Sequence, residues 1–158
     1  MANPANETVV YPFTAFNFAV EISVAGDQSP LCHAAFSECD GLELTMEVKT
    51  IREGGNNGQQ IRLTGPRNYG QLTLKRGMTA NFDLWEWADR TLTAPTLRAD
   101  ATVIVFAADG QTPRAQFVLG RCLPIKLKAP ALNAKDGTVA IEELQIAYES
   151  LTVQKPTE

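Results

Sequence analysis

The sequence predicts a mainly β protein, an antiparallel β-barrel or sandwich with one short flanking α-helix at about residues 81–92. Apolar and polar residues alternate with a period of two in several segments, as in strands that bury one face. Clusters of glycine, proline and asparagine separate these segments at short intervals, as turns do in all-β domains. Closing the sheet into a barrel also removes exposed strand edges, so a barrel is a favourable arrangement for these strands.

Alternation is clearest in two segments of the first third of the chain. The apolar positions are Phe16, Phe18, Val20, Ile22 and Val24 in the first, and Leu42, Leu44, Met46 and Val48 in the second. We expect each to be a half-buried strand whose other face is wet or faces an interface. Another strand is expected at 31–38.

The stretch 50–77 combines features with different structural needs. It begins as a strand, breaks into a glycine- and asparagine-rich loop at 53–58, and resumes as a strand at 60–63. A turn is expected at Gly65-Pro66-Arg67, followed by a strand at 71–76. A long polar loop between strands is costly to hold inside one compact domain, so we expect it to be either disordered or ordered by a partner.

The helix expected at 81–92 has Asn81 as its N-cap, with Glu86 and Arg90 as an i,i+4 pair on its polar face. Its apolar face is formed by Leu84, Trp85, Ala88 and Leu92. Such a face usually docks on a sheet or plugs a barrel end, so these four are predicted to be packing residues. A stacking site for a ligand is the less favoured interpretation of the tryptophans.

The last third predicts strands at 101–107, 115–119, 125–128 and 138–152. In the last of these the apolar parity switches after Ile141, and a β-bulge near Glu142-Glu143 would restore a common face. The whole of 1–158 is predicted to be one domain, with flexible arms at about 1–12 and 154–158.

Composition excludes several classes of protein. The net charge of −4 supplies no basic footprint for nucleic acid, so direct sequence-specific nucleic-acid binding is not expected. No apolar run is long enough to span a bilayer, and residues 1–8 lack the features of a signal peptide, so we expect synthesis in the cytoplasm. Cys32, Cys39 and Cys122 lack zinc-site spacing and are expected to be free, buried thiols.

An enzymatic function is not expected, and neither is a cofactor or a metal. His33 is the only histidine, and the cluster Gly54–Gly58 lacks the lysine and helix of a phosphate-binding loop. Glu142 and Glu143 are neighbours on a strand and would point apart, whereas carboxylate-pair catalysis needs both to face one substrate. A monomeric β-barrel binding module for a small ligand or peptide is the alternative outside the structural proteins.

A family resemblance runs through the same segments. The central motif is Arg52-Glu53-Gly54-Gly55, then Leu63, Gly65 and Tyr69, then Leu72-Thr73-Leu74-Lys75-Arg76-Gly77, then Leu84, Trp85 and Trp87. The opening motif is Phe16-Asn17-Phe18 with Ile22, Phe36 and Gly41-Leu42, and the closing motif is Val139-Ala140-Ile141-Glu142 with Glu149-Ser150-Leu151. In this order they resemble the tail-tube protein of contractile phage tails and extracellular contractile injection systems, which is related to the type VI secretion tube protein.

The resemblance implies a structural subunit of an inner tube. Such subunits form stacked rings, expected to be hexameric, that make a hollow conduit driven through a target envelope by sheath contraction. The implied partners are other copies of the chain, sheath subunits, baseplate and tube-cap proteins, and a luminal cargo of effector proteins or phage DNA. The residues do not decide between a phage tail and an injection system, or between the repeating tube subunit and a ring near the baseplate.

The predicted subunit interface combines the polar loop with the neighbouring basic residues. It comprises Arg52, Glu53, Gly54, Gly55, Asn56, Asn57, Gly58, Arg62, Arg67, Lys75 and Arg76. The acidic residues expected to alternate with them across subunit contacts are Glu43, Glu47, Glu53, Glu142 and Glu143. A solvated strand face is the alternative interpretation of the basic cluster.

Overall fold

The computed structural model describes residues 12–14, 17–55 and 58–156. These contain ten strands and one helix: β1 (Phe18–Val24), β2 (Cys32–Ala34), β3 (Glu38–Asp40), β4 (Leu44–Ile51), β5 (Ile61–Tyr69), β6 (Gln71–Gly77), α1 (Asp83–Thr93), β7 (Ala99–Phe106), β8 (Pro113–Lys128), β9 (Ile141–Ala147) and β10 (Ser150–Gln154). No helix in the described part of the chain is long and apolar enough to cross a bilayer.

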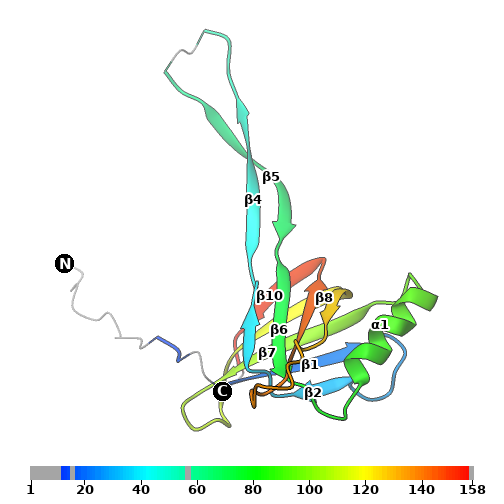
Figure 1. Cartoon of the computed structure of the whole chain (residues 1–158). Coiled ribbons are helices and arrows are strands. Elements are labelled where there is room, and N and C mark those ends of the chain that lie inside the picture. Colours follow the sequence, from blue (N-terminus) through cyan, green and yellow to red (C-terminus); the bar gives the residue numbers. More distant parts are fainter. Residues whose placement is uncertain (1–11, 15–16, 56–57, 157–158) are drawn as a thin grey trace, which may run out of the picture.

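Eight strands form a folded antiparallel sheet in the order β2-β1-β7-β8-β9-β6-β3, with β10 also paired to β8 (Figure 1). The 16-residue strand β8 serves both halves, because its first part pairs with β7 and β10 and its last part pairs with β9. The backbone turns from one half to the other at Arg121, which has a φ of 52°. The expected class, mainly β and antiparallel with one helix, is confirmed.

A short corner of the chain connects the two edge strands of this sheet, β2 and β3. Strands β2 and β3 end the sheet order on its two sides, yet only Ala35–Ser37 separates them in the chain. Phe36 in this corner is buried against the core. The two halves are therefore joined by β8 on one side and by the Phe36 corner on the other, and they enclose one core.

Alternating side chains from both halves fill this core. They are Val20, Ile22 and Val24 on β1, Ala101 and Val103 on β7, Leu72 and Leu74 on β6, and Leu144 and Ile146 on β9. Each set repeats every two residues, as expected for strands with one buried face. The helix α1 packs against β8 beside this core.

The predicted packing face of the helix is partly wrong. Leu84 is buried, Ala88 and Trp85 are half-buried, and Leu92 is 81% exposed. The second fully buried residue is Trp87, so the buried face follows 84, 87, 88 and 91 and is rotated from the predicted one. Both faces satisfy helical spacing, and a tryptophan occurs on each, which is why the spacing alone could not choose between them.

The polar interactions of the helix also differ in part from those expected. The Asn81 Oδ1 accepts the Asp83 backbone N–H at 3.0 Å, although the cap position itself is Phe82. Arg90 pairs with Asp27 in the β1–β2 loop at 3.0 and 3.2 Å, instead of forming the predicted pair with Glu86. This bidentate contact lowers the pKa of Asp27.

The turn predicted at Gly65-Pro66-Arg67 is wrong. Strand β5 continues through these residues, and the pairing passes from Met46↔Arg67 to Val48↔Thr64. Gly65 and Pro66 therefore face the single residue Glu47 as a β-bulge. A Cβ on Gly65 would lie 2.7 Å from the Glu47 carbonyl oxygen, so the close approach requires glycine.

The β-bulge predicted near Glu142-Glu143 is also wrong. Strand β9 pairs with β6 without a break, from Gln71↔Ala147 to Gly77↔Ile141. Glu142 stays on the same buried face as Leu144, whereas Val139 is exposed. The segment predicted as one strand at 138–152 forms two strands, β9 and β10, because the chain turns after Ala147 and pairs next with β8.

The three thiols are free, with Cys32 and Cys122 buried and Cys39 half-buried. Burial raises the pKa of Cys39 to about 11 and the pKa of Cys122 to about 12. Both groups are therefore neutral at pH 7, and neutral thiols are poor nucleophiles. Flexible terminal segments are predicted at 1–12 and 154–158. Residues 1–11 and 157–158 lie outside the described residues, and Gln154 belongs to β10.

We expect Trp87→Ala to lower the free energy of unfolding by about 3–5 kcal/mol, because it removes a fully buried aromatic side chain. The control Leu92→Ala on the same helix should change it by less than about 0.5 kcal/mol, because that side chain is in solvent. Urea denaturation followed by circular dichroism measures both. Equal losses in the two variants would contradict the assigned helix face.

Candidate assembly interface

Strands β4 and β5 form a separate two-stranded sheet that projects from the body as a long arm (Figure 1). We call residues 44–69 the arm and the other described residues the body. The arm pairs from Leu44↔Tyr69 at its base to Ile51↔Ile61 near its tip. Every residue of β4 is exposed. The half-buried face expected for 42–48 is therefore wrong within one chain for 44–48, because no second layer of the described residues covers the strand, whereas Leu42 packs against the core.

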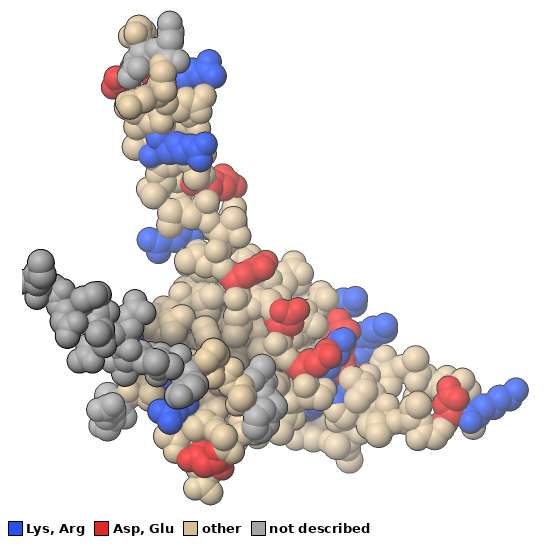
Figure 2. Space-filling view, turned by 90° about the vertical axis from the view of Figure 1, so that its left-hand side faces the viewer, with Lys and Arg blue, Asp and Glu red and all other residues tan. Residues whose placement is uncertain are grey.

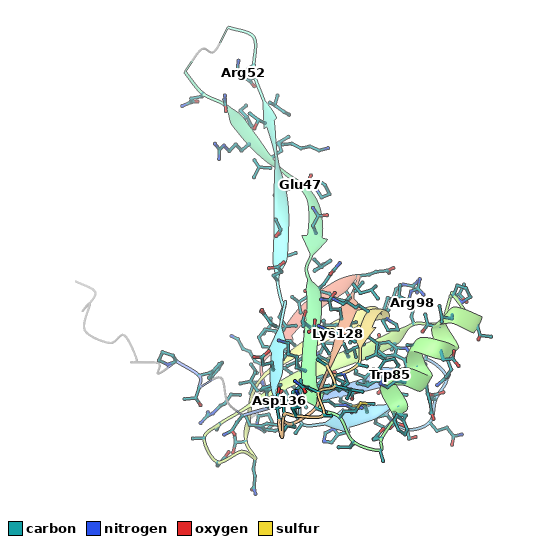
Figure 3. All side chains as sticks on the ribbon, in the orientation of Figure 1. Glu47, Arg52, Trp85, Arg98, Lys128 and Asp136 are labelled. Atoms are coloured by element: carbon teal, nitrogen blue, oxygen red, sulfur yellow. The ribbon has the colours of Figure 1, made fainter. Side chains whose placement is uncertain are left out.

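The predicted loop residues lie together at the tip of the arm. Arg52, Glu53, Gly54, Gly55 and Gly58 are exposed there, whereas Asn56 and Asn57 lie outside the described residues. Figure 2 shows Lys and Arg side chains at several levels along the arm, with acidic side chains between them. Figure 3 places Arg52 at the far end and Glu47 about midway.

The root of the arm is bonded to the body through Tyr148. The Tyr148 hydroxyl donates to the Gly41 carbonyl oxygen at 2.7 Å and accepts the Glu43 N–H at 3.1 Å. The Gly70 N–H donates to the Glu43 carbonyl at 3.2 Å, and the rings of Tyr69 and Tyr148 are 5.7 Å apart. Both passages of the chain into the arm are therefore fixed at the same place.

Gly41 is required at this root for two reasons. Its φ is 98°, a conformation that side chains with a Cβ rarely adopt. A Cβ at this position would also lie 1.8 Å from the carbonyl oxygen of Gln71, at the start of β6. The chain can turn from β3 into the arm only because residue 41 has no side chain.

The predicted basic cluster is divided by the structure. Arg62 and Arg67 are exposed on the arm, and the Lys75 Nζ lies 3.1 Å from Glu38 on the body surface. Arg76 is only 7% exposed, so its assignment as an interface residue is wrong. The physical reason is strand geometry, because neighbours on β6 point to opposite faces and Arg76 follows Leu72 and Leu74 into the core.

Arg76 belongs to a buried polar network that the sequence reasoning missed. Its Nε donates to the Glu142 Oε1, and its Nη2 donates to the Asn81 carbonyl at 3.3 Å. Trp85 donates its indole N–H to the other Glu142 oxygen at 3.1 Å. Glu142 is therefore no surface partner for a neighbouring subunit. The parity that it shares with Leu144 and Ile146 was the signal that could have shown this.

The described residues provide an extended surface for assembly. No group of three or more His, Cys, Asp and Glu side chains within them could hold a metal ion. Exposed backbone edges and large apolar side chains on a two-stranded arm are features of a contact surface between protein chains.

Comparison with known families identifies the class of protein. Residues 14–152 match the family model of the T4-like virus tail tube protein gp19. The match covers well over half of the chain, and the protein therefore belongs to this tail tube family.

Similar chains occur in several solved assemblies. One, from the 6-fold symmetrised anti-feeding prophage (AFP) baseplate, has a TM-score of 0.80 and 26% identity, with 92% of this chain and 97% of that chain covered. A chain of the PVC sheath-tube complex, an extracellular contractile injection system in its extended state, has a TM-score of 0.78 and 19% identity. The match covers 94% of this chain and 95% of that chain. A chain of the AFP tube-terminating cap has a TM-score of 0.77 and 20% identity, with 99% of this chain and 100% of that chain covered.

A more distant likeness concerns the fold alone. The crystal structure of an Hcp protein gives a TM-score of 0.56 at 10% identity, covering 87% of this chain and 98% of that chain. No curated protein matches the chain in sequence. The expected tube-protein fold is confirmed, and the Hcp protein shares this fold.

We expect Glu142→Gln to cost about 3–5 kcal/mol of stability, because it leaves the Arg76 guanidinium buried without a counter-charge. Glu143→Gln is the matched control, since its side chain is on the other face of β9, and should cost less than about 0.5 kcal/mol. Thermal and urea melts of both variants measure the difference. A Glu142 variant as stable as its control would show that the pair does not stabilise the fold.

We expect Tyr148→Phe to loosen the root of the arm while keeping the ring contact with Tyr69. Loss of the hydroxyl leaves the Glu43 N–H without its partner, at a cost of about 1–3 kcal/mol if no water replaces it. Hydrogen–deuterium exchange at 41–43 should become faster than in the wild type, with no change in β7. Unchanged exchange at the root would contradict the role given to this hydroxyl.

Proposed function

We propose that this tail tube protein is the inner-tube subunit of a contractile phage tail or extracellular contractile injection system, and that six copies close into a ring. Family membership supports the tube function, and a similar chain in a 6-fold symmetrised baseplate supports the ring size. Rings of this kind stack head to tail into a hollow conduit, which the surrounding sheath drives through the target envelope.

The projecting arm is the observation that best supports assembly. An isolated two-stranded hairpin is at best marginally stable in water, yet this arm holds large apolar side chains in the open. A contact between different surfaces of neighbouring copies, repeated around a closed ring, would cover it. We therefore assign the tip residues Arg52–Gly55 and Gly58, with Arg62 and Arg67, to a contact with an adjacent subunit. Asn56 and Asn57 belong to the same proposed contact by their position in the sequence.

Partners follow from the same assignment. Chains similar to this one occur in a sheath-tube complex, a baseplate and a tube-terminating cap, and we assign sheath, baseplate and cap proteins as its partners. The lumen conducts DNA in a phage tail or effector proteins in an injection system. The subunit is synthesised and assembled in the cytoplasm, and its function is structural, not enzymatic. Neither the family nor the similar structures support the alternative of a monomeric ligand-binding module.

Trimming Gly54–Gly58 should leave the body folded but weaken the formation of rings and tubes. Shortening a loop changes closure entropy only slowly, so the melting temperature should shift little. Electron microscopy and analytical ultracentrifugation of the trimmed and wild-type proteins measure assembly, and circular dichroism checks folding.

Two outcomes would contradict the proposal at different levels. A trimmed variant that forms normal tubes at normal yield would remove the tip from the interface. A wild-type protein that stays monomeric at every concentration, with no rings in micrographs, would argue against a tube subunit altogether.

A further inference from the structure

We infer that the arm binds the acidic body of a second copy of this chain along one side only, through an apolar stripe that crosses from one strand face to the other. The stripe consists of Leu44, Met46, Val48, Ile51, Ile61 and Leu63. This inference rests on the proposed function and narrows its contact to one side of the arm, which leaves Arg62, on the other side, outside the contact.

The apolar residues change strand face partway along the arm. Leu44, Met46 and Val48 alternate along β4 and therefore share one face near the base. Near the tip, Ile51 pairs with Ile61 on the opposite face. Leu63 pairs with Lys49 and shares that second face. Considered as a flat ribbon, the arm would have two separate apolar patches facing in opposite directions.

The arm is not flat, because two-stranded ribbons twist strongly. In Figure 1, β4 and β5 exchange sides between the base and the tip. A side chain on the second face near the tip therefore points to the same side of the arm as one on the first face near the base. The change of parity between Val48 and Ile51 compensates for the twist and keeps the apolar residues in one line.

The stripe is open in the single chain. All six of its side chains are between 42% and 57% exposed, although the residues are among the most apolar types. Scattered exposed apolar residues need no explanation, but an aligned set on a projecting element indicates a binding surface. The other side of the arm is polar, with Thr45 and Asn68 near the base and Thr50 and Arg62 near the tip.

Charge identifies the occupant. The arm has four basic and two acidic residues, a net charge of +2, whereas the body has ten basic and fourteen acidic residues, a net charge of −4. The two charged residues on the stripe side are both basic, Arg67 opposite Met46 and Lys49 opposite Leu63. Glu47 lies on the other side, where Asn68 donates to it at 3.0 Å. An arm with this distribution complements the body of another copy and repels another arm.

Thiol labelling can show whether the contact follows one side of the twisted arm or one face of the β4 strand. We propose single-cysteine variants at two stripe positions, Val48→Cys and Leu63→Cys, and at one position on the polar side, Thr50→Cys. Thr50 shares its strand face with Val48, but lies past the change of parity. The native thiols give a low background, because Cys32 and Cys122 are buried and the pKa of Cys39 is about 11.

Maleimide labelling rates are compared for the unassembled protein and for assembled tubes. We expect labelling at positions 48 and 63 to slow by about tenfold or more on assembly, and labelling at position 50 to change by less than about threefold. Protection of 48 and 50 with 63 still reactive would overturn the stripe in favour of a flat contact face. Equal protection at all three positions would show an arm covered on both sides and would also overturn it.

A charge reversal tests the occupant. Lys49→Glu on the stripe side should raise the concentration needed for assembly by about tenfold or more, and Thr50→Glu on the polar side should change it by less than about threefold. Equal effects, or easier assembly of the Lys49 variant, would exclude an acidic occupant. In each of these results wild-type tubes still form and the proposed function stands. A wild-type chain that never assembles would overturn both inferences.

Discussion

The buried pair of Arg76 and Glu142 holds together the half of the body whose strands β3 and β6 lead into and out of the arm. It joins β6 to β9 across the sheet and, through Trp85 and the Asn81 carbonyl, it holds the helix against the same strands. The Arg76 guanidinium also lies 5.7 Å from the Phe36 ring in the corner that links the two halves. Two buried charges are costly unless every hydrogen bond is satisfied, so the network tolerates few arrangements. The network holds β6 in place, β6 pairs with β3, and β3 is the strand that precedes the arm in the chain.

Periodicity predicted where the strands lie better than it predicted which of their apolar faces are buried in this chain. The alternation in 18–24 and in 44–48 is equally regular, yet Val20 and Ile22 are buried while Leu44 and Val48 are exposed. Alternation records that one face is apolar, and it does not record which chain covers that face. For β1 the cover comes from the same chain, whereas for β4 the described part of the chain supplies none. A half-buried strand in an assembly and one in a monomeric core therefore look alike in sequence.

The other differences also have physical causes. A glycine followed by proline marks a turn or a β-bulge, and only pairing across the arm shows that Gly65-Pro66 is a bulge opposite Glu47. The sequence groups Arg76 with other basic residues as a predicted interface, but strand geometry turns Lys75 and Arg76 to opposite faces and buries Arg76. The loop at the tip, in contrast, was correctly placed between two strands, because glycine and asparagine interrupt both patterns strongly. The sequence thus located the tip loop between two strands, and only the three-dimensional twist revealed that the apolar residues of the arm form one line.

The hydrogen bonds of the Tyr148 hydroxyl make the arm a stiff projection with a fixed direction, in contrast to a flexible linker. Tyr148 bonds the first chain passage at the root and contacts Tyr69 of the second, and Gly70 bonds Glu43 across the two passages, so the arm meets its partner with its direction already set. Little orientational entropy then remains to be lost on docking, and preorganisation of this kind favours association. The same stiffness has a consequence under load. A pull on the tip is transmitted through the paired backbones of β4 and β5 to the flanking strands β3 and β6, so that a load on one subunit of a moving tube would also strain the subunits that its arm contacts.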